Sequence, residues 1–317
     1  MGRIRHDWRF VFDMDGCRQF SVGNVTRIER FGWRGAVEPG IGRIVSAHGD
    51  YYHLVCNEQP TGEILARKKK SAFMRMKTVA PENMKGKKIS EERAELPPRP
   101  ITGDFVRFRY NAQGESMITE VLPRFSHFER KDPTAKRTSQ TLAVNFNTLF
   151  IMMSLNENFS TARIRRYLDL AKDMGGAEAV VVVTKVDLRQ DGDEEFFDEL
   201  REEVGGDARI LQISALTGEG MDDVMEYVRP GETLAFIGSS GVGKSTLLNT
   251  LVGEEWQATQ EIQEWSGKGR HTTTSRELVM LPSGAMVIDT PGIREIGMLG
   301  ERDDLQAKGE ATHRYRK

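Results

Sequence analysis

The strongest chemical signal in the sequence is a glycine-rich turn that ends in a lysine and a serine. The segment TLAFIGSSGVGKSTLLNTL, residues 233–251, carries the pattern G-x4-G-K-S directly after an apolar run. In this pattern backbone N–H groups curl around phosphates at a helix N-terminus, the lysine reaches the β- and γ-phosphates, and the serine hydroxyl binds Mg²⁺. We therefore predict a P-loop made of Gly238, Ser239, Ser240, Gly241, Val242, Gly243, Lys244, Ser245 and Thr246, with Lys244 also a catalytic candidate.

A second pattern, T-K-V-D at residues 184–187, points to the base of the nucleotide. It ends an apolar run and is a form of the guanine motif N-K-x-D. The Asp187 carboxylate would accept hydrogen bonds from guanine N1–H and the N2 amine, which adenine cannot supply. Lys185 would pack its stem along the base. Thr184 stands where asparagine is more usual, which leaves the support of this loop open.

A companion motif follows the next apolar run. Ser214, Ala215 and Leu216 lie at its end, and the backbone N–H of Ala215 would meet the guanine O6 atom. The two motifs together predict GTP and GDP as ligands rather than ATP.

Two further segments predict the metal site and the nucleotide sensor. Asp289 ends an apolar run in the sequence D-T-P-G, where Gly292 N–H would contact the γ-phosphate. The segment GRHTTT, residues 269–274, supplies a switch threonine. We choose Thr273 because it lies 16 residues before Asp289. The expected Mg²⁺ ligands are Ser245, Thr273 and Asp289.

Hydrolysis also needs a residue that orients the attacking water. Many GTPases place a glutamine after D-T-P-G, whereas this chain has Ile293, which can neither donate nor accept a hydrogen bond. We expect slow intrinsic hydrolysis. His271, beside the switch threonine, is a catalytic candidate, although it could equally form only a hydrogen bond within its loop.

The motif order is that of a circularly permuted domain. The base-reading motifs precede the P-loop, whereas an ordinary small GTPase begins with the P-loop. Permutation preserves a compact α/β site because the chain ends of such domains often lie close together.

The elements around the motifs predict two domains. From residue 141 onward, apolar runs alternate with amphipathic helical patterns, which indicates a mostly parallel sheet covered on both faces. Between residues 42 and 123, short alternating strands with turn signals indicate a small β-barrel. We predict an arm over 1–35, a barrel over 36–122, a linker over 123–140, a GTPase domain over 141–300 and a short basic tail over 301–317.

Composition and charge limit the class of protein. Two cysteines, Cys17 and Cys56, cannot make a disulfide framework, and no apolar run approaches the ~20 residues that span a bilayer. We expect a cytoplasmic protein without a membrane partner. Residues 1–140 carry a net charge of +9 and the remainder −11, so the first half is suited to a polyanion or is merely solubilised by its charge. The candidate RNA contacts are Arg67, Lys68, Lys69, Lys70 and Lys77.

Residues 36–299 resemble the family of circularly permuted GTPases called ribosome small-subunit-dependent GTPase A (RsgA, also YjeQ or YloQ). The resemblance rests on GRIVSAHGDYYHLV, ITGDFV, RFSHFERKDP and GRHTTT, together with the motif order. It implies an OB-fold barrel that binds ribosomal RNA, a GTPase stimulated by the small ribosomal subunit, and a role in late maturation of that subunit. We expect a monomer.

One departure from the family concerns zinc. Family members normally continue into a zinc-binding segment with three cysteines and a histidine, whereas no cysteine follows Gly292 here. We therefore predict Mg²⁺ and no zinc.

Two other functions fit parts of the pattern. The chain could be an RNA-binding assembly module in which the nucleotide is structural, or a P-loop ATPase or nucleotide kinase. The first alternative predicts no stimulation by small subunits, and the second requires that the base site accept adenine.

Overall fold

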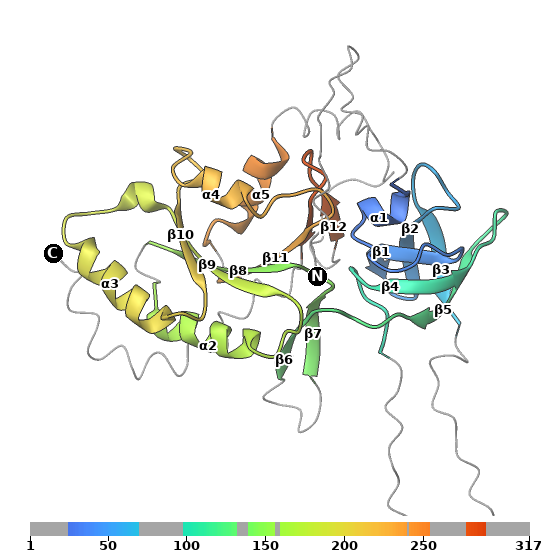
Figure 1. The fold of residues 1–317 in the computed structure, drawn as a ribbon, viewed down its shortest axis with the longest axis horizontal. Helices are drawn as coiled ribbons and strands as arrows, with labels where there is room; N and C mark the ends of the chain where they lie inside the picture. Colours follow the sequence, from blue (N-terminus) through green and yellow to red (C-terminus); the bar gives the residue numbers. More distant parts are fainter. Residues whose placement is uncertain are drawn as a thin grey trace, which may run out of the picture.

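A computed structural model describes residues 25–69, 98–131, 139–155, 159–239, 241–253 and 277–289. Within these residues, a small barrel forms one end of the molecule, and a larger sheet flanked by helices forms the rest (Figure 1).

The barrel is built from five short strands whose side chains alternate between core and solvent. Tyr52, Leu54, Phe108 and Ile118 fill its interior, as period-two patterning requires. β1 pairs with both β2 and β4, and β3 runs parallel to β5, so the barrel closes in the order β1-β2-β3-β5-β4. This confirms the predicted OB-type barrel. Its strands are β1 (Ile41–His48), β2 (Tyr51–Cys56), β3 (Ile64–Lys68), β4 (Phe105–Arg109) and β5 (Ser116–Val121).

A short helix, α1 (Arg27–Arg30), closes one end of the barrel. Its Ile28 side chain is fully buried in a cluster with Ile41, Phe105 and Leu122. The predicted N-terminal arm reached residue 35, but its last described part packs as a piece of the barrel. Ile28 is the only apolar residue of α1 and lies within a charged segment. One apolar residue gives too weak a pattern for the sequence to reveal the helix.

The larger sheet has the order β10-β9-β8-β11-β13-β12. Its first five strands are parallel and β12 is antiparallel to β13, so the sheet is mostly parallel as predicted. The antiparallel strand was not predicted. The strands are β8 (Thr148–Ser154), β9 (Glu178–Thr184), β10 (Arg209–Ile213), β11 (Thr233–Ile237), β12 (Glu277–Met280) and β13 (Met286–Asp289).

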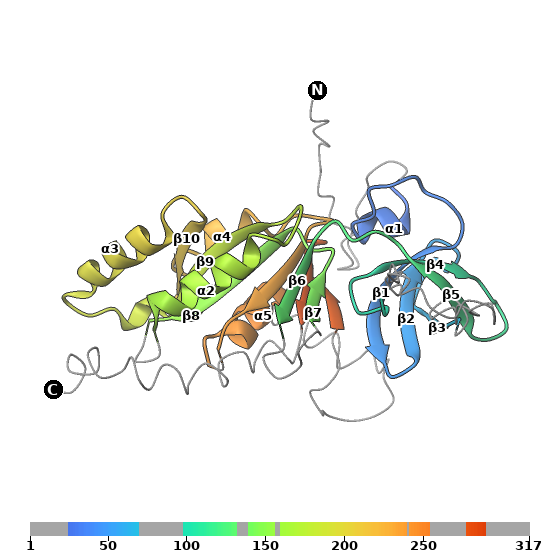
Figure 2. The same ribbon diagram turned by 90° about the horizontal axis from the view of Figure 1, so that it is seen from below.

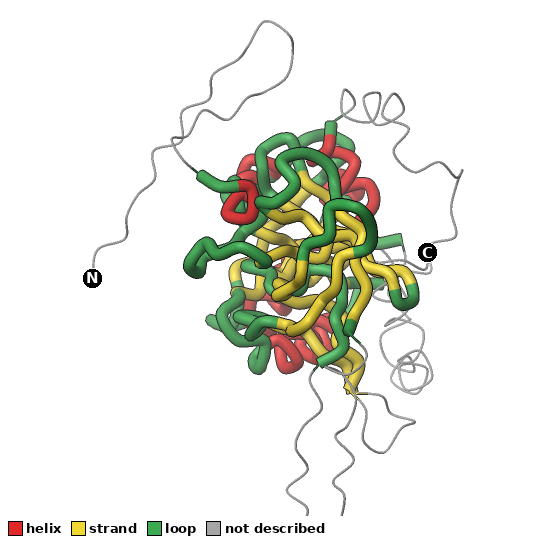
Figure 3. The backbone as a smooth tube through the Cα atoms, turned by 90° about the vertical axis from the view of Figure 1, so that its right-hand side faces the viewer, coloured by secondary structure: helices red, strands yellow, loops and turns green. Residues whose placement is uncertain are grey.

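Helices cover both faces of this sheet, which explains why its strands are apolar throughout (Figure 3). Ile151 and Met153 of β8 pack with α2 and α3 on one face. Phe150 and Met152, one residue out of phase, pack with α4 and α5 on the other. The helices are α2 (Thr161–Ala171), α3 (Asp193–Val204), α4 (Met221–Met225) and α5 (Lys244–Val252).

The segment predicted as a linker begins a hairpin. β6 (His127–Lys131) and β7 (Ser139–Val144) pair with each other as a separate two-stranded sheet. The apolar residues that anchor it, Phe128, Leu142 and Ala143, are buried in the core that the larger sheet forms with α2 and α3. They lie only at the base of the hairpin, so the polar stretch between them has the composition of a linker.

The two parts also share a sheet. Ser46 of β1 pairs with Glu277 of β12, which joins the barrel strands and the strands of the larger sheet into one eleven-stranded sheet. Figure 2 shows the barrel beside the rest of the molecule. Among the described residues, no helix has both the length and the apolar character to cross a membrane.

Candidate nucleotide site

The predicted motifs lie at one edge of the larger sheet. β8, β9, β10, β11 and β13 are parallel, so their carboxyl ends meet at the same edge. Thr184 ends β9 and is in register with Ile213, the last residue of β10. The P-loop follows β11, and β13 ends at Asp289. The structure thus brings the base-reading motifs, the P-loop and a predicted metal ligand to one edge.

The P-loop turns sharply away from β11 at Gly238. Its φ of 150° lies in a region that side chains rarely adopt, and a Cβ built there would lie 2.4 Å from the carbonyl oxygen of Met152. Only glycine lets the loop backbone approach β8 this closely. The turn leads into α5, whose first residue is Lys244 and whose N-cap is Gly243.

Lys244 folds back over the loop that precedes it. Its ammonium group donates hydrogen bonds to the carbonyl oxygens of Gly238 at 2.6 Å and Ser239 at 2.7 Å. The Ser239 hydroxyl is buried without a hydrogen-bond partner within the described residues, and Ser240 lies outside them. A positive charge over a loop at a helix N-terminus is the arrangement that binds phosphate groups.

Thr184 joins the base-reading loop to the P-loop. Its hydroxyl donates a hydrogen bond to the carbonyl oxygen of Val242 at 2.7 Å, with a longer contact to Met153 at 3.4 Å, and the side chain is buried. The sequence left open how threonine, in place of asparagine, supports this loop. This bond answers that question, because the short side chain reaches the P-loop directly.

The next three residues form a tight turn that exposes the predicted guanine ligand. Lys185 has φ 61°, a left-handed conformation that is uncommon for a residue with a Cβ. A 3₁₀ turn, η2 (Val186–Leu188), follows, in which Val186 is buried and Asp187 is exposed. The turn therefore holds the Asp187 carboxylate at the surface, where a base could reach it.

The companion motif is held by its own hydrogen bonds. Ser214 is buried, its N–H donates to the carbonyl of Glu219 at 2.9 Å, and its hydroxyl accepts from the N–H of Thr217 at 3.2 Å. Ala215 is partly exposed, and the Leu216 side chain is 83% exposed. An apolar side chain this open to solvent at the same edge as Asp187 offers a surface for a planar base.

The sequence profile of the RsgA GTPase family matches residues 121–299. The chain belongs to the RsgA GTPase family. The matched range contains every predicted nucleotide-site residue, from Thr184 to Gly292, and begins just before the β6–β7 hairpin.

Proteins similar to this chain carry the family name. One is the small ribosomal subunit biogenesis GTPase RsgA of Leptospira interrogans, 41% identical over 209 residues, which are 65% of this chain and 57% of that protein. Another is RsgA 2 of Lactiplantibacillus plantarum, 39% identical over 258 residues, which are 81% of this chain and 66% of that protein. The chain thus spans about 57% to 66% of the length of these RsgA relatives.

A solved structure supports the same fold. The crystal structure of YjeQ from Thermotoga maritima superposes with a TM-score of 0.53 at 25% identity, covering 80% of this chain and 75% of that one. The coverage includes both the barrel and the nucleotide-binding part, since neither alone reaches 80% of the chain.

RsgA GTPases, like GTPases in general, use Mg²⁺, and two of its three predicted ligands belong to the described part of the chain. Ser245 lies exposed in the first turn of α5, and β13 ends at Asp289; hydroxyl and carboxylate oxygens are ligands that Mg²⁺ prefers. No group of three His, Cys, Asp or Glu residues placed to hold a metal occurs in the described part of the chain. The absence of zinc stays a prediction. His271, Thr273 and Gly292 lie outside the described residues.

The predicted RNA contacts lie on β3 of the barrel, as far as they are described. Arg67 forms an ion pair with Glu115 at 2.6 Å, and Lys68 lies 3.3 Å from Asp50, so acidic neighbours offset part of their charge. Lys69 follows β3 directly. Lys70 and Lys77 lie outside the described residues, as does the basic tail over 301–317.

An aromatic residue that the sequence reasoning did not single out lies beside them. The Arg67 guanidinium stands 4.3 Å from the centre of the Tyr51 ring, and Tyr51 is 38% exposed. The sequence signal for this contact is a tyrosine at an outward-facing strand position. It could not be read in advance, because the β2–β3 register that places Tyr51 opposite Arg67 is known only from the structure.

Proposed function

We propose that the protein is a GTP hydrolase that acts as a molecular switch in late maturation of the small ribosomal subunit. The hydrogen bond from Thr184 to Val242 carries the proposal, because it sets the guanine-reading loop directly against the phosphate-binding loop. Membership of the RsgA GTPase family and the names of the relatives support the same assignment.

The proposed chemistry is attack of water on the γ-phosphorus of GTP, with cleavage of the bond to the β–γ bridging oxygen. The P-loop N–H groups and Lys244 would bind the phosphates and stabilise their charge. Bound Mg²⁺ would neutralise the phosphate oxygens, held by Ser245 and Asp289, with Thr273 as a third ligand. His271 is the candidate for orienting the water.

Regulation by the subunit follows from the residue after the D-T-P-G motif, residues 289–292. Ile293 occupies the place of a water-orienting glutamine, so intrinsic hydrolysis is expected to be slow. An ordered ribosomal surface would complete the site, and hydrolysis to GDP would time release from the subunit.

The barrel is the proposed RNA-binding part. Across its outer face the strand register aligns Tyr51 with Arg67, Arg67 with Met117, and Met117 with Arg109. Tyr51 and Met117 are 38% and 43% exposed, and Arg109 also points to solvent. A row of cations with an aromatic ring suits a single-stranded or looped RNA, in which phosphates meet the cations and a base stacks on the ring.

The proposal keeps the barrel over 36–122 and the GTPase over 141–300 as the two domains, and it assigns the β6–β7 hairpin between them to the GTPase, because Phe128 and Leu142 lie in the core of that domain. It also places the protein in the cytoplasm, as a monomer whose partners are GTP, GDP and the small subunit with its RNA.

Single-turnover GTP hydrolysis with and without purified small subunits tests the activity and the partner together. Faster hydrolysis in the presence of subunits is expected. Equal rates would favour an RNA-binding module in which the nucleotide is structural.

Base recognition has a separate test in Asp187→Asn. This variant should lose affinity for GTP and gain affinity for XTP, because the amide can donate to the xanthine O2 atom where the carboxylate cannot. ATP binding equal to GTP binding in the wild type would instead indicate an ATPase or nucleotide kinase.

A further inference from the structure

One fully buried arginine links the barrel to the nucleotide-binding sheet. Arg43 of β1 is 1% exposed. On the side of the GTPase part, its guanidinium donates hydrogen bonds to the Asn145 carbonyl at 2.8 Å and to the Thr233 hydroxyl at 3.0 Å, and contacts the Met286 sulfur at 3.4 Å. On the side of the barrel it donates to the Phe31 carbonyl at 2.6 Å. Burial lowers the pKa of Arg43 to about 9, so the group is still charged at neutral pH.

The groups that Arg43 contacts are the beginnings of two functional strands. Thr233 is the first residue of β11, whose other end runs into the P-loop at Gly238. Met286 is the first residue of β13, whose other end is Asp289. These two strands pair in parallel register, Thr233 with Met286. A displacement of Arg43 would therefore act at the starts of both strands that carry phosphate and metal ligands.

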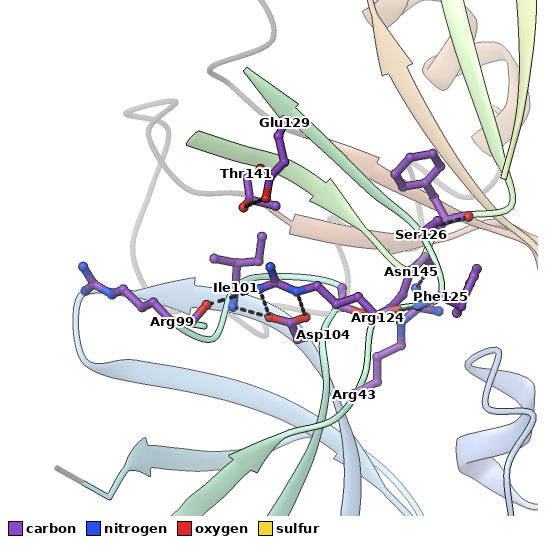
Figure 4. A network of polar contacts seen from close by, with 12 residues as sticks. Arg43, Arg99, Ile101, Asp104, Arg124, Phe125, Ser126, Glu129, Thr141 and Asn145 are labelled. Carbon is purple, nitrogen blue, oxygen red and sulfur yellow. Dashed lines mark hydrogen bonds and ion pairs between the residues drawn. The ribbon is translucent and has the colours of Figure 1, made fainter. Parts of the chain in front are cut away.

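Further polar contacts link the residues around Arg43 to the barrel (Figure 4). Asn145 has φ 53° and donates its side-chain amide to the Gly103 carbonyl at 3.1 Å, the same oxygen that Arg43 Nε approaches at 3.4 Å. The next residue, Asp104, is fully buried and accepts two hydrogen bonds from Arg124, at 2.7 and 2.8 Å. Arg124 belongs to the segment that leads from the barrel to the β6–β7 hairpin.

Apolar packing couples the same surfaces. Ile44 and Val45 are consecutive in β1 and point to opposite faces of the strand, so Ile44 lies in the barrel core and Val45 in the core of the GTPase part. The β1–β2 register shifts at this point, between Ile44 and Ser46. Val55 of β2 is buried in the same GTPase core, so two barrel strands contribute to it. Barrel and GTPase sheet therefore cannot separate without opening a shared core.

Breaking this contact at Arg43 would leave buried acceptors without a donor. The Asn145 carbonyl and the Thr233 hydroxyl, in buried contacts, and the Phe31 carbonyl, in a part-buried one, lose a charged partner, which is more costly than losing an exposed pair. The hydrogen bonds of Arg43 thus hold the barrel and the larger sheet in one relative arrangement.

We propose that Arg43 is a positioning residue that transmits RNA engagement of the barrel to the GTP site, through the starts of β11 and β13. The inference rests on the proposed function, because it concerns how the subunit, bound through the barrel, stimulates hydrolysis. Arg43 contacts neither nucleotide nor RNA. It acts by keeping the barrel and the two strands in one arrangement.

The test compares Arg43→Met with wild type in GTP hydrolysis, with and without saturating small subunits. We expect the variant to lose most of the stimulation, about tenfold, while its basal rate and its KM for GTP stay within about twofold of wild type. Arg165→Met is the matched control, because Arg165 of α2 pairs with Asp169 of the same helix and with Asp207, which follows α3, away from the barrel. It should keep full stimulation.

A second variant keeps the test decisive if Arg43→Met is poorly folded. Adding Ser46→Cys and Glu277→Cys to Arg43→Met places a disulfide across the β1–β12 pair. Oxidation should restore stimulation and reduction should abolish it again, since the crosslink replaces the lost connection. An oxidised, folded protein that is still not stimulated would overturn the inference.

Two outcomes separate this inference from the function on which it rests. Equal stimulation of wild type and Arg43→Met would overturn the coupling through Arg43 alone. Absence of stimulation in the wild type would overturn the proposed function and, with it, the coupling.

Discussion

The hydroxyl of Thr184 and the carbonyl oxygen of Val242 form a 2.7 Å hydrogen bond that ties the guanine-reading loop to the P-loop. The two residues are 58 positions apart in the chain: Thr184 ends β9, and Val242 lies in the loop between β11 and α5. The bond couples the positions of the two loops, so we expect recognition of the base and of the phosphates to be linked.

Replacing Thr184 by valine tests this tie. Valine has nearly the same shape but leaves the Val242 carbonyl without its donor, which costs about 1–3 kcal/mol for a buried acceptor. We expect GTP affinity to fall by about tenfold, the equivalent of 1.4 kcal/mol, as measured by isothermal titration. Thr184→Ser keeps the hydroxyl and should bind GTP like the wild type. Unchanged affinity of Thr184→Val would show that the two loops are positioned independently.

Gly238 offers a second test of the phosphate site. Alanine at this position would place its Cβ 2.4 Å from the Met152 carbonyl oxygen, at a φ that alanine rarely adopts, so the loop must move away from β8. We expect Gly238→Ala to lose GTP binding in titration calorimetry. Gly206→Ala is the matched control, because no atom lies within 4 Å of a Cβ built there and its φ is unremarkable. Binding by Gly238→Ala at wild-type affinity would contradict the tight-turn geometry.

A histidine in the barrel gives the protein a local pH dependence. The hydrogen bond from His53 to Glu63, at 3.2 Å, raises the pKa of His53 above its usual value, against the effect of burial. This pair contributes stability that is fully present below the unfolded pKa of about 6.5 and is lost as pH rises through the raised pKa.

Urea unfolding at a series of pH values measures that dependence. In Glu63→Gln, the pKa of His53 should lie closer to its ordinary value. The free energy of unfolding should therefore fall less steeply above about pH 6.5 than in wild type. His53→Gln should likewise make the free energy of unfolding fall less steeply with pH over this range, because the titrating group is gone. Parallel stability curves for wild type and both variants would contradict the assignment of this proton to His53.

The sequence predicted the five barrel strands and the parallel sheet because their apolar periods are strong and local. The P-loop and the base-reading motifs were equally visible, since each is a short stretch whose chemistry depends on spacing. What could not be read from the sequence depends on partners distant in the chain. Arg43 has the spacing of a barrel residue, yet it is buried by Asn145, Thr233 and Met286, up to 243 residues away.

The antiparallel strand β12 and the β6–β7 hairpin were missed for the same reason. β12 has only four residues, too few to reveal a period, and the hairpin is mostly polar, so each is held by neighbours rather than by its own pattern. β12 pairs with β13 on one side and, through Glu277, with the barrel on the other. The hairpin is anchored by Phe128 and Leu142 at its base. A composition-based boundary at residues 123–140 therefore cuts through a structured part of the molecule.

The outer face of the barrel yields the last prediction, which concerns the RNA. If a base stacks on Tyr51 while Arg67 meets a phosphate, the two substitutions should behave differently. Tyr51→Leu removes the ring and should cost about 1–3 kcal/mol of affinity with little change in salt dependence. Arg67→Gln should weaken binding and reduce the slope of log K against log salt by roughly one contact. Filter binding of small subunits at several KCl concentrations separates the two effects.

Arg201→Gln serves as the control, because this exposed arginine pairs with Asp198 on α3, outside the barrel, and should change neither quantity. If Arg67→Gln and Arg201→Gln bind alike at every salt concentration, the RNA does not lie on this row of the barrel.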